Sequence, residues 1–136
     1  KSCKLPIVLH VRKAHEDVLL YLKTMKFQEG GIVHAFNGSM QQAERYREFG
    51  FKLGFGGAMT YPKAVKLREL ATKLPLSDIV LETDAPDMMP ANCSKEHNSP
   101  LNIFENFNTL VELRDESAED IAQQTTQNSR HILRVS

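Results

Sequence analysis

The sequence predicts an α/β protein built on four parallel strands, each followed by helical sequence. Three observations support this fold class: short apolar runs, amphipathic segments between them, and repetition of this alternation along 136 residues. Parallel crossovers are right-handed, so the chain forms either four strands of an open sheet or one half of a (β/α)8 barrel. Apolar outer strands favour self-pairing, which favours the half-barrel closed by a partner half. No linker divides residues 1–136, so we expect one domain, a partial barrel.

Two apolar runs, residues 5–10 and 32–35, predict the first two strands. The first run, LPIVLH, is almost wholly apolar, as in a parallel strand that is buried on both faces. The segment between the runs predicts an amphipathic helix, which Gly30 and Gly31 terminate. Its apolar residues recur at helical spacing: Val18, Leu19, Leu22 and Met25.

The second crossover and the third strand follow the same pattern. Ser39 is a favourable N-cap for the helix after the second strand, and Gly50 suits the position just past the end of that helix. Residues 51–55 predict the third strand. The next helix, residues 62–74, starts with a proline, whose missing N–H has no partner in a first helical turn in any case.

Residues 78–83 predict the fourth strand, and a polar loop with three prolines follows at residues 84–100. This loop is longer than a connector requires, which indicates a functional segment. Two helices complete the chain. The last begins at Ser117, with Asp120 placed as in a shortened capping box. Three residues supply part of its apolar face: Ile121, Ala122 and Leu133.

The composition excludes several classes of protein. Seventeen basic and seventeen acidic residues give a formal net charge of zero, so no global attraction to nucleic acid or to an anionic membrane is expected. No apolar run approaches the roughly 20 residues that a membrane span needs, and the N-terminal residues lack the apolar region of a signal peptide. Cys3 and Cys93 form no CxxC pair. We therefore expect a cytoplasmic protein with reduced thiols and no membrane partner.

Candidate metal ligands follow three of the predicted strands. His10, His34 and Asp84 each stand at the C-terminal end of a strand, which is where parallel α/β folds place their sites. Imidazole and carboxylate groups are ligands for Zn²⁺, Mn²⁺ and related ions. Each residue also has a structural explanation: a hydrogen-bonded histidine, or an aspartate in a turn or helix cap. The joint placement favours a metal site.

Four motifs carry a resemblance to a known family. PIVLHVR at residues 6–12, VHAFNGS at 33–39, GFGGAMTYP at 54–62 and LETDAP at 81–86 resemble successive motifs of the TatD family of metal-dependent deoxyribonucleases. The similarity covers almost the whole chain, and the spacing of the motifs fits. The bacterial branch of TatD-related hydrolases is more similar than the best-known nuclease.

The resemblance implies a TIM barrel with one or two divalent metal ions, Mg²⁺, Mn²⁺ or Zn²⁺. By that resemblance His10 and His34 bind the second metal, while Asp84 binds the first metal and handles the attacking water. Glu82 is expected to support the ligands from outside, with a purely structural pairing as the alternative.

The sequence departs from the family in one large respect. The HxH pair of the family's first strand and the bridging glutamate of its fourth strand have no counterpart in these 136 residues. The resemblance therefore implies a C-terminal half that begins at the fifth strand of the barrel. We expect this piece to need the N-terminal half as a partner and to be inactive alone.

Phosphate contacts have weaker candidates. Arg12 lies two residues past His10, and Ser39 opens a helix whose N-terminus suits an anion; the alternatives are a solvated charge and a plain N-cap. Asn98, in the long loop, is a further possible substrate contact. His15, at a helix start, is expected at the surface.

These observations favour a metal-dependent nuclease that hydrolyses DNA phosphodiester bonds with metal-activated water. Hydrolysis of an amide or an ester by the same chemistry is the nearest alternative, because the family resemblance fixes metal chemistry better than substrate. A noncatalytic α/β module that binds a partner through its open sheet edges is the alternative from another class.

Overall fold

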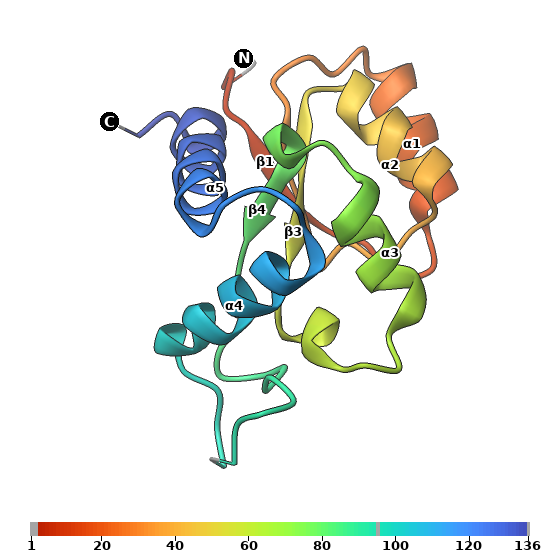
Figure 1. The fold of residues 1–136 in the computed structure, drawn as a ribbon. Helices are drawn as coiled ribbons and strands as arrows, with labels where there is room; N and C mark the ends of the chain where they lie inside the picture. Colours follow the sequence, from red (N-terminus) through yellow and green to blue (C-terminus); the bar gives the residue numbers. More distant parts are fainter. Residues whose placement is uncertain (1–2, 95, 136) are drawn as a thin grey trace.

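Four parallel strands form a single sheet in the computed structural model, which describes residues 3–94 and 96–135 (Figure 1). The strand order is the order of the sequence, β1-β2-β3-β4, and every neighbouring pair is parallel. The strands are β1 (Ile7–His10), β2 (Gly31–His34), β3 (Phe51–Phe55) and β4 (Ile79–Leu81). The predicted alternation of parallel strands and helices is confirmed.

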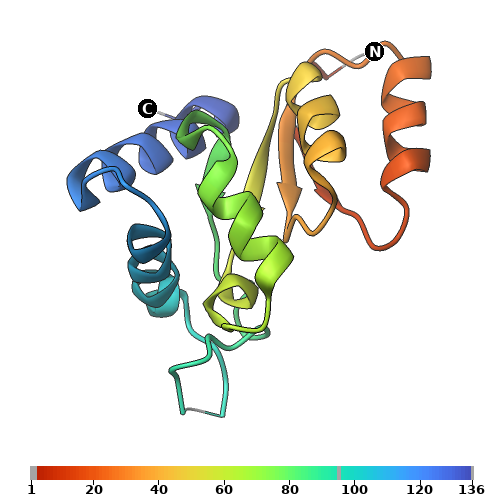
Figure 2. The same ribbon diagram turned by 45° about the vertical axis from the view of Figure 1, so that its right-hand side comes forward.

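Five α-helices connect and flank the strands: α1 (His15–Thr24), α2 (Met40–Glu48), α3 (Val65–Lys73), α4 (Ile103–Leu113) and α5 (Ala118–Leu133). Three short 3-10 helices add Gly57–Thr60, Leu76–Asp78 and Pro100–Asn102. Figure 2 shows α1, α2 and α3 following one another around the sheet, with α4 and α5 at the end nearest β4. None of the helices within the described ranges has both the length and the apolar character that crossing a bilayer requires.

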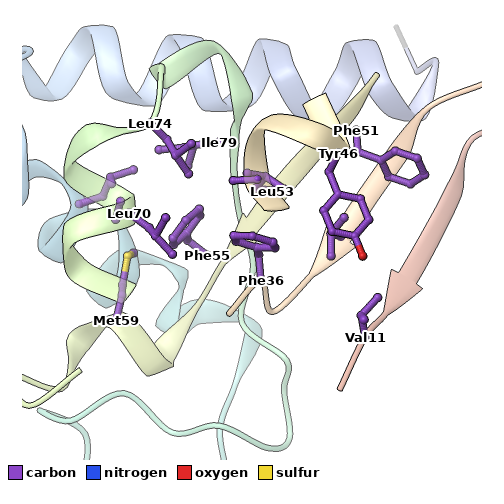
Figure 3. Packing of buried hydrophobic residues seen from close by; sticks show 14 of the residues in the cluster. Val11, Phe36, Tyr46, Phe51, Leu53, Phe55, Met59, Leu70, Leu74 and Ile79 are labelled. Atoms are coloured by element: carbon purple, nitrogen blue, oxygen red, sulfur yellow. The ribbon is translucent and has the colours of Figure 1, made fainter. Parts of the chain in front are cut away.

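The core lies between the helices and one face of the sheet. Alternate strand residues point into it, because successive side chains of a strand face opposite ways. Val33, Leu53 and Ile79 are fully buried there. Tyr46 from α2 packs edge-on against Phe36 and Phe51 in the same cluster (Figure 3). Burial of one such side chain contributes roughly 1.5–3 kcal/mol, so this one-sided core is the main stabilising contact of the sheet.

The other face of the sheet is partly open at β1. Val8 is 64% exposed and Leu5 is 61% exposed, and His10 is exposed as well. The prediction that residues 5–10 are buried on both faces is therefore wrong for the chain as described. No described element packs over these side chains, so they would become buried only if further protein covered this face.

The predicted end of the first helix is wrong. The first helix stops at Thr24, so Met25 lies past its end and is 72% exposed. Gly31 opens β2 and Gly30 directly precedes it, so neither glycine ends α1. A β-carbon on Gly30 would lie 2.5 Å from the backbone oxygen of Gly50, and one on Gly31 would collide with the backbone of β1.

The predicted proline start of the third helix is also wrong. Pro62 lies in a turn whose closing hydrogen bond runs from the N–H of Ala64 to the oxygen of Tyr61, 3.0 Å away. The helix α3 begins only at Val65. This turn occupies the segment that the sequence pattern assigned to the first helical turn, and a 3-10 helix at residues 57–60 precedes it.

Both ends of α2 and the start of α5 were predicted correctly. Ser39 accepts a hydrogen bond from the N–H of Gln42, and the Gln42 side chain accepts one from the N–H of Ser39, which makes a full capping box. Gly50 has a φ of 78°, which favours glycine after the end of α2. Ser117 accepts a hydrogen bond from the N–H of Asp120 at the start of α5.

The buried face of α5 differs from the prediction. Ile121 is buried as expected, but Ala122 and Leu133 are exposed. The helix packs through a mixed apolar and polar face: Ile121, Thr125, Asn128 and Ile132. The amide of Asn128 donates to the backbone oxygens of Leu76 and Ile79, each at 2.8 Å. The sequence pattern missed this face because half of it is polar and satisfied by backbone oxygens.

Candidate metal centre

The two strand-end histidines are neighbours at one rim of the sheet. His10 ends β1 and His34 ends β2, and the two residues are paired in the strand register. Their ring centroids are 5.5 Å apart, with 33° between the ring planes. The register therefore places two imidazoles side by side where the carboxyl ends of the strands meet.

Both ring nitrogens of His34 face carboxylates from the segment after β4. Nδ1 lies 3.0 Å from Oε1 of Glu82, and Nε2 lies 3.2 Å from Oδ1 of Asp84. The Asp84 side chain is 39% exposed, whereas those of His34 and Glu82 are at most 18% exposed. The structure therefore brings three predicted site residues together, with Asp84 on the solvent side.

Two left-handed residues set this geometry. Ala35 directly follows His34 and has a φ of 46°, and Asp84 has a φ of 54°. Alanine rarely adopts this conformation, so the surrounding contacts must hold it there. One contact is direct: the N–H of Ala35 donates to Oε1 of Glu82 at 2.6 Å. The bend after β2 thus ties the Glu82 carboxylate to the backbone beside His34.

Glu82 occupies space that a glycine leaves free. A β-carbon on Gly54 of β3 would collide with Oε2 of Glu82 and lie 2.8 Å from its carboxyl carbon. Burial raises the pKa of the Glu82 carboxyl; hydrogen bonding with His34 and with the N–H of Ala35 opposes this rise, and the charge of Asp84 adds to it. The glycines of the GFGG motif therefore provide room for a desolvated carboxylate.

Asparagines fix the backbone of the loop after β4. The amide of Asn98 donates to the backbone oxygens of Thr83 and Asp87, each at 2.6 Å, and its oxygen accepts from the N–H of Ser99 and from Asn102. Asn98 is buried, and its polar atoms are taken up in the protein. The predicted substrate contact at Asn98 is therefore replaced by a structural role in the loop that carries Asp84.

Sequence reasoning missed Asn106 of α4. Its amide donates to the backbone oxygen of Glu82 at 2.7 Å, and the residue is fully buried. The only signal in the sequence is a polar residue on the buried face of a helix, which does not identify its partner. Asn106 fixes the backbone of Glu82 through this hydrogen bond.

The other predicted contacts have different surroundings. Arg12 is exposed at the same rim, just past β1. The hydroxyl of Ser39 is engaged as the N-cap of α2. His15 does begin α1, but the expectation that it is exposed is wrong, because it is only 8% exposed.

The donor set suits a divalent metal ion, but only as part of a site. With Nδ1 of His34 held by a carboxylate, Nε2 is left as the nitrogen that can bind a metal, an arrangement common at metal sites. Asp84 adds an oxygen beside that nitrogen. Within residues 3–94 and 96–135, however, no group of three or more His, Cys, Asp or Glu side chains is arranged to hold a metal ion.

Four parallel β/α units with donor side chains at the C-terminal strand ends define a chain of the β/α-barrel class. Residues 1–134 match the sequence model of the TatD related DNases, and the chain belongs to this family. It is 42% identical over 135 residues to the uncharacterized metal-dependent hydrolase YjjV of Escherichia coli, covering 99% of this chain and 52% of YjjV. It is 34% identical to the uncharacterized metal-dependent hydrolase YabD of Bacillus subtilis, covering 99% of this chain and 53% of that protein.

Solved structures agree with the fold. The crystal structure of E. coli YjjV, a TatD homologue, matches 97% of this chain and 51% of its own, with a TM-score of 0.89. A TatD family hydrolase from Entamoeba histolytica, only 19% identical, has the same fold over 96% of this chain and 51% of its own, with a TM-score of 0.80. The prediction of half a (β/α)8 barrel is confirmed.

The chain spans about half the length of the curated relatives that it matches. We use the term complete barrel for a protein in which this chain is accompanied by the remaining half, supplied by its own gene or by E. coli YjjV.

The contact between Gly54 and Glu82 gives the first prediction. Gly54→Ala in the complete barrel should lower the free energy of unfolding by about 1–3 kcal/mol, because the new methyl group overpacks the carboxylate. Adding Glu82→Ala removes the atoms that the methyl group strikes, so the two losses measured in urea should not add. Losses that add within about 0.5 kcal/mol would show that the two residues do not interact.

Proposed function

We propose that this chain is part of a metal-dependent hydrolase that cleaves phosphodiester bonds in DNA. The observation that carries the proposal is the rim arrangement of His34, with one ring nitrogen on Glu82 and the other facing Asp84. Membership of the TatD related DNase family supports the same activity. Two of the similar proteins, YjjV and YabD, are themselves named metal-dependent hydrolases.

In this proposal His10, His34 and Asp84 hold one or two divalent ions, with Mg²⁺, Mn²⁺ and Zn²⁺ as candidates. When bound, such ions lower the pKa of water, polarise a phosphoryl oxygen and stabilise the leaving oxygen. Glu82 keeps the proton of His34 on Nδ1, so that Nε2 presents a lone pair. The carboxylate of Glu82 also makes the imidazole of His34 a stronger metal ligand.

Asp84 is the proposed catalytic residue. Its carboxylate is more exposed than the side chains of His34 and Glu82, so it can meet both water and substrate. Its left-handed backbone turns it from the end of β4 toward the rim. There its oxygen orients the attacking water and can accept the proton that the water loses. Asn106 holds the backbone before Asp84, and Asn98 holds it on both sides of Asp84, at Thr83 and at Asp87.

The remaining half of the barrel is the proposed partner. The relatives are about twice as long as this chain, and the donors among the described residues make only part of a ligand set. The open face at Val8 and the rim at His10 both lie at β1. A second half that packs on this side would therefore bury Val8 and add the missing metal ligands next to His10.

Metal binding tests the ligands. His34→Ala in the complete barrel should weaken metal binding by at least roughly 100-fold, the upper end of what loss of an outer-shell partner costs. His10→Ala should reduce affinity or stoichiometry as well. His131→Ala, on the exposed face of α5, is the matched control. Titration calorimetry with Mn²⁺ and Zn²⁺ gives both quantities, and unchanged values in the His10 and His34 variants would contradict the assignment.

Asp84→Asn tests the catalytic role. Asparagine tolerates the left-handed backbone, so the fold should persist while the charge is lost. We expect the rate of single-stranded DNA cleavage to fall by roughly 10²–10⁴. Asp87→Asn, an exposed aspartate in the same loop, should stay within a few fold. Cleavage of amides or esters in place of DNA would support metal-dependent hydrolysis but contradict the proposal that DNA is the substrate.

Complementation tests the division of the site. The chain alone should cleave no DNA and should self-associate through its open β1 face, whereas mixing it with the remaining half should restore metal-dependent cleavage. Gel filtration and a nuclease assay on the same samples give both results. Full activity from the chain alone would mean that its own residues complete the site, contrary to the proposal.

A further inference from the structure

His15 opens α1 but lies inside the protein. Its ring is edge-on to Phe36 and Tyr46, with centroids 5.5 Å and 5.7 Å away. Nδ1 is 3.1 Å from the hydroxyl oxygen of Tyr46, and Nε2 is 3.2 Å from Oδ1 of Asn37. The buried His15 therefore links the Tyr46 side chain of α2 to Asn37 at the rim, three positions after His34.

Burial of Tyr46 determines the direction of these hydrogen bonds. Tyr46 is fully buried, and His15 Nδ1 is the partner that the described residues offer its hydroxyl. Leaving the hydroxyl proton without an acceptor there would cost about 1–3 kcal/mol. Burial also raises the pKa of Tyr46 to about 12, so the hydroxyl keeps its proton. Tyr46 thus donates to Nδ1, and the proton of neutral His15 is on Nε2.

The same reasoning orients Asn37. Nε2–H of His15 donates, so the atom of Asn37 that faces it is the acceptor oxygen. The amide nitrogen stands on the other arm of the planar group, and the Asn37 side chain is exposed. Asn37 is therefore a fixed hydrogen-bond donor toward solvent, whereas a free surface asparagine could present either end.

Asn37 borders two hollows of the surface. One is the recess whose walls include Glu82 and Asp84. The other is a groove between the loop after β2 and the start of α3, lined by Asn37, Gly38, Lys63 and Lys66 among others. Both lysines are exposed, and no carboxylate among the described residues lies within ion-pair distance of either. The groove thus has positive charge and an oriented N–H donor next to the site.

We propose that Asn37, Lys63 and Lys66 form a subsite for a backbone phosphate of the DNA strand, and that His15 is the positioning residue for Asn37. The inference rests on the proposed function and adds the path of the substrate: a phosphate next to the scissile one lies in the groove between the loop after β2 and the start of α3. A chain of net charge zero needs such a local site to hold an anionic polymer.

Asn37→Asp in the complete barrel is the direct test. The aspartate keeps the acceptor for His15 but replaces the outward donor with a negative charge. The KM for single-stranded DNA should rise roughly 10-fold or more, equivalent to one hydrogen bond to a charged group, with kcat within about twofold. Asn108→Asp on α4 adds the same charge at an exposed site away from the groove and should leave KM unchanged.

His15 is tested by a pair of variants. His15→Phe keeps an aromatic ring in the interior but releases Asn37, so KM should rise while kcat stays near the parent value. Gln can accept from Tyr46 and donate to Asn37, so His15→Gln should restore KM. A purely structural role for His15 would lower thermal stability and kcat in both variants without this selective rescue.

Binding in a chelator separates this proposal from the proposed function. An oligonucleotide with phosphodiester linkages should bind the parent more tightly than the same sequence with neutral methylphosphonate linkages. The double variant Lys63→Gln, Lys66→Gln should reduce that difference. The slope of log binding constant against log salt concentration should also become less negative, by roughly 0.7 for each phosphate that the lysines no longer neutralise. Absence of DNA cleavage with this discrimination intact would overturn the function alone. Equal binding of both oligonucleotides, or unchanged binding by Asn37→Asp, would overturn the subsite.

Discussion

The rim depends on one buried carboxylate, that of Glu82. It meets Nδ1 of His34, accepts the N–H of left-handed Ala35, and lies in the space that Gly54 leaves free. A carboxylate removed from water is costly unless its hydrogen bonds are satisfied. The local backbone satisfies that requirement: β2 bends immediately after His34, and β3 carries no side chain where it passes the carboxylate. The conformations of three strands at this rim are thus linked by the needs of a single charged group.

Hydrophobic periodicity predicted the part of the fold that depends on it. The third strand matches residues 51–55, and Ser39 and Gly50 bound α2 as expected. These features are local, because a cap or a buried run is encoded within a few neighbouring residues. The placement of His10 and His34 at one rim also follows from local sequence once the strands are parallel.

Long-range contacts could not be predicted in the same way. The burial of His15 depends on Tyr46, 31 positions away, and that of Asn128 on backbone oxygens about 50 positions away. A polar residue reads as surface until its partner is known, because the pairing rather than the residue type makes burial tolerable. Pro62 illustrates the converse: its residue type suited a helix start, but the chain forms a turn at this position, and α3 begins only at Val65.

In the proposed barrel, the division of the ligand set between two halves has a consequence for assembly. Within the described residues, no group of three or more His, Cys, Asp or Glu side chains is arranged to hold a metal ion, so the proposal places further ligands on the remaining half. An ion held by ligands from both halves binds the closed barrel more tightly than it binds either separate half. Linkage then requires that the bound ion stabilise the closed barrel by the same free energy that closure adds to metal binding. Metal supply in the cell would accordingly control how much barrel is assembled as well as how fast it works. A chelator would therefore promote dissociation of the two halves of such a protein, and an excess of metal would promote their association.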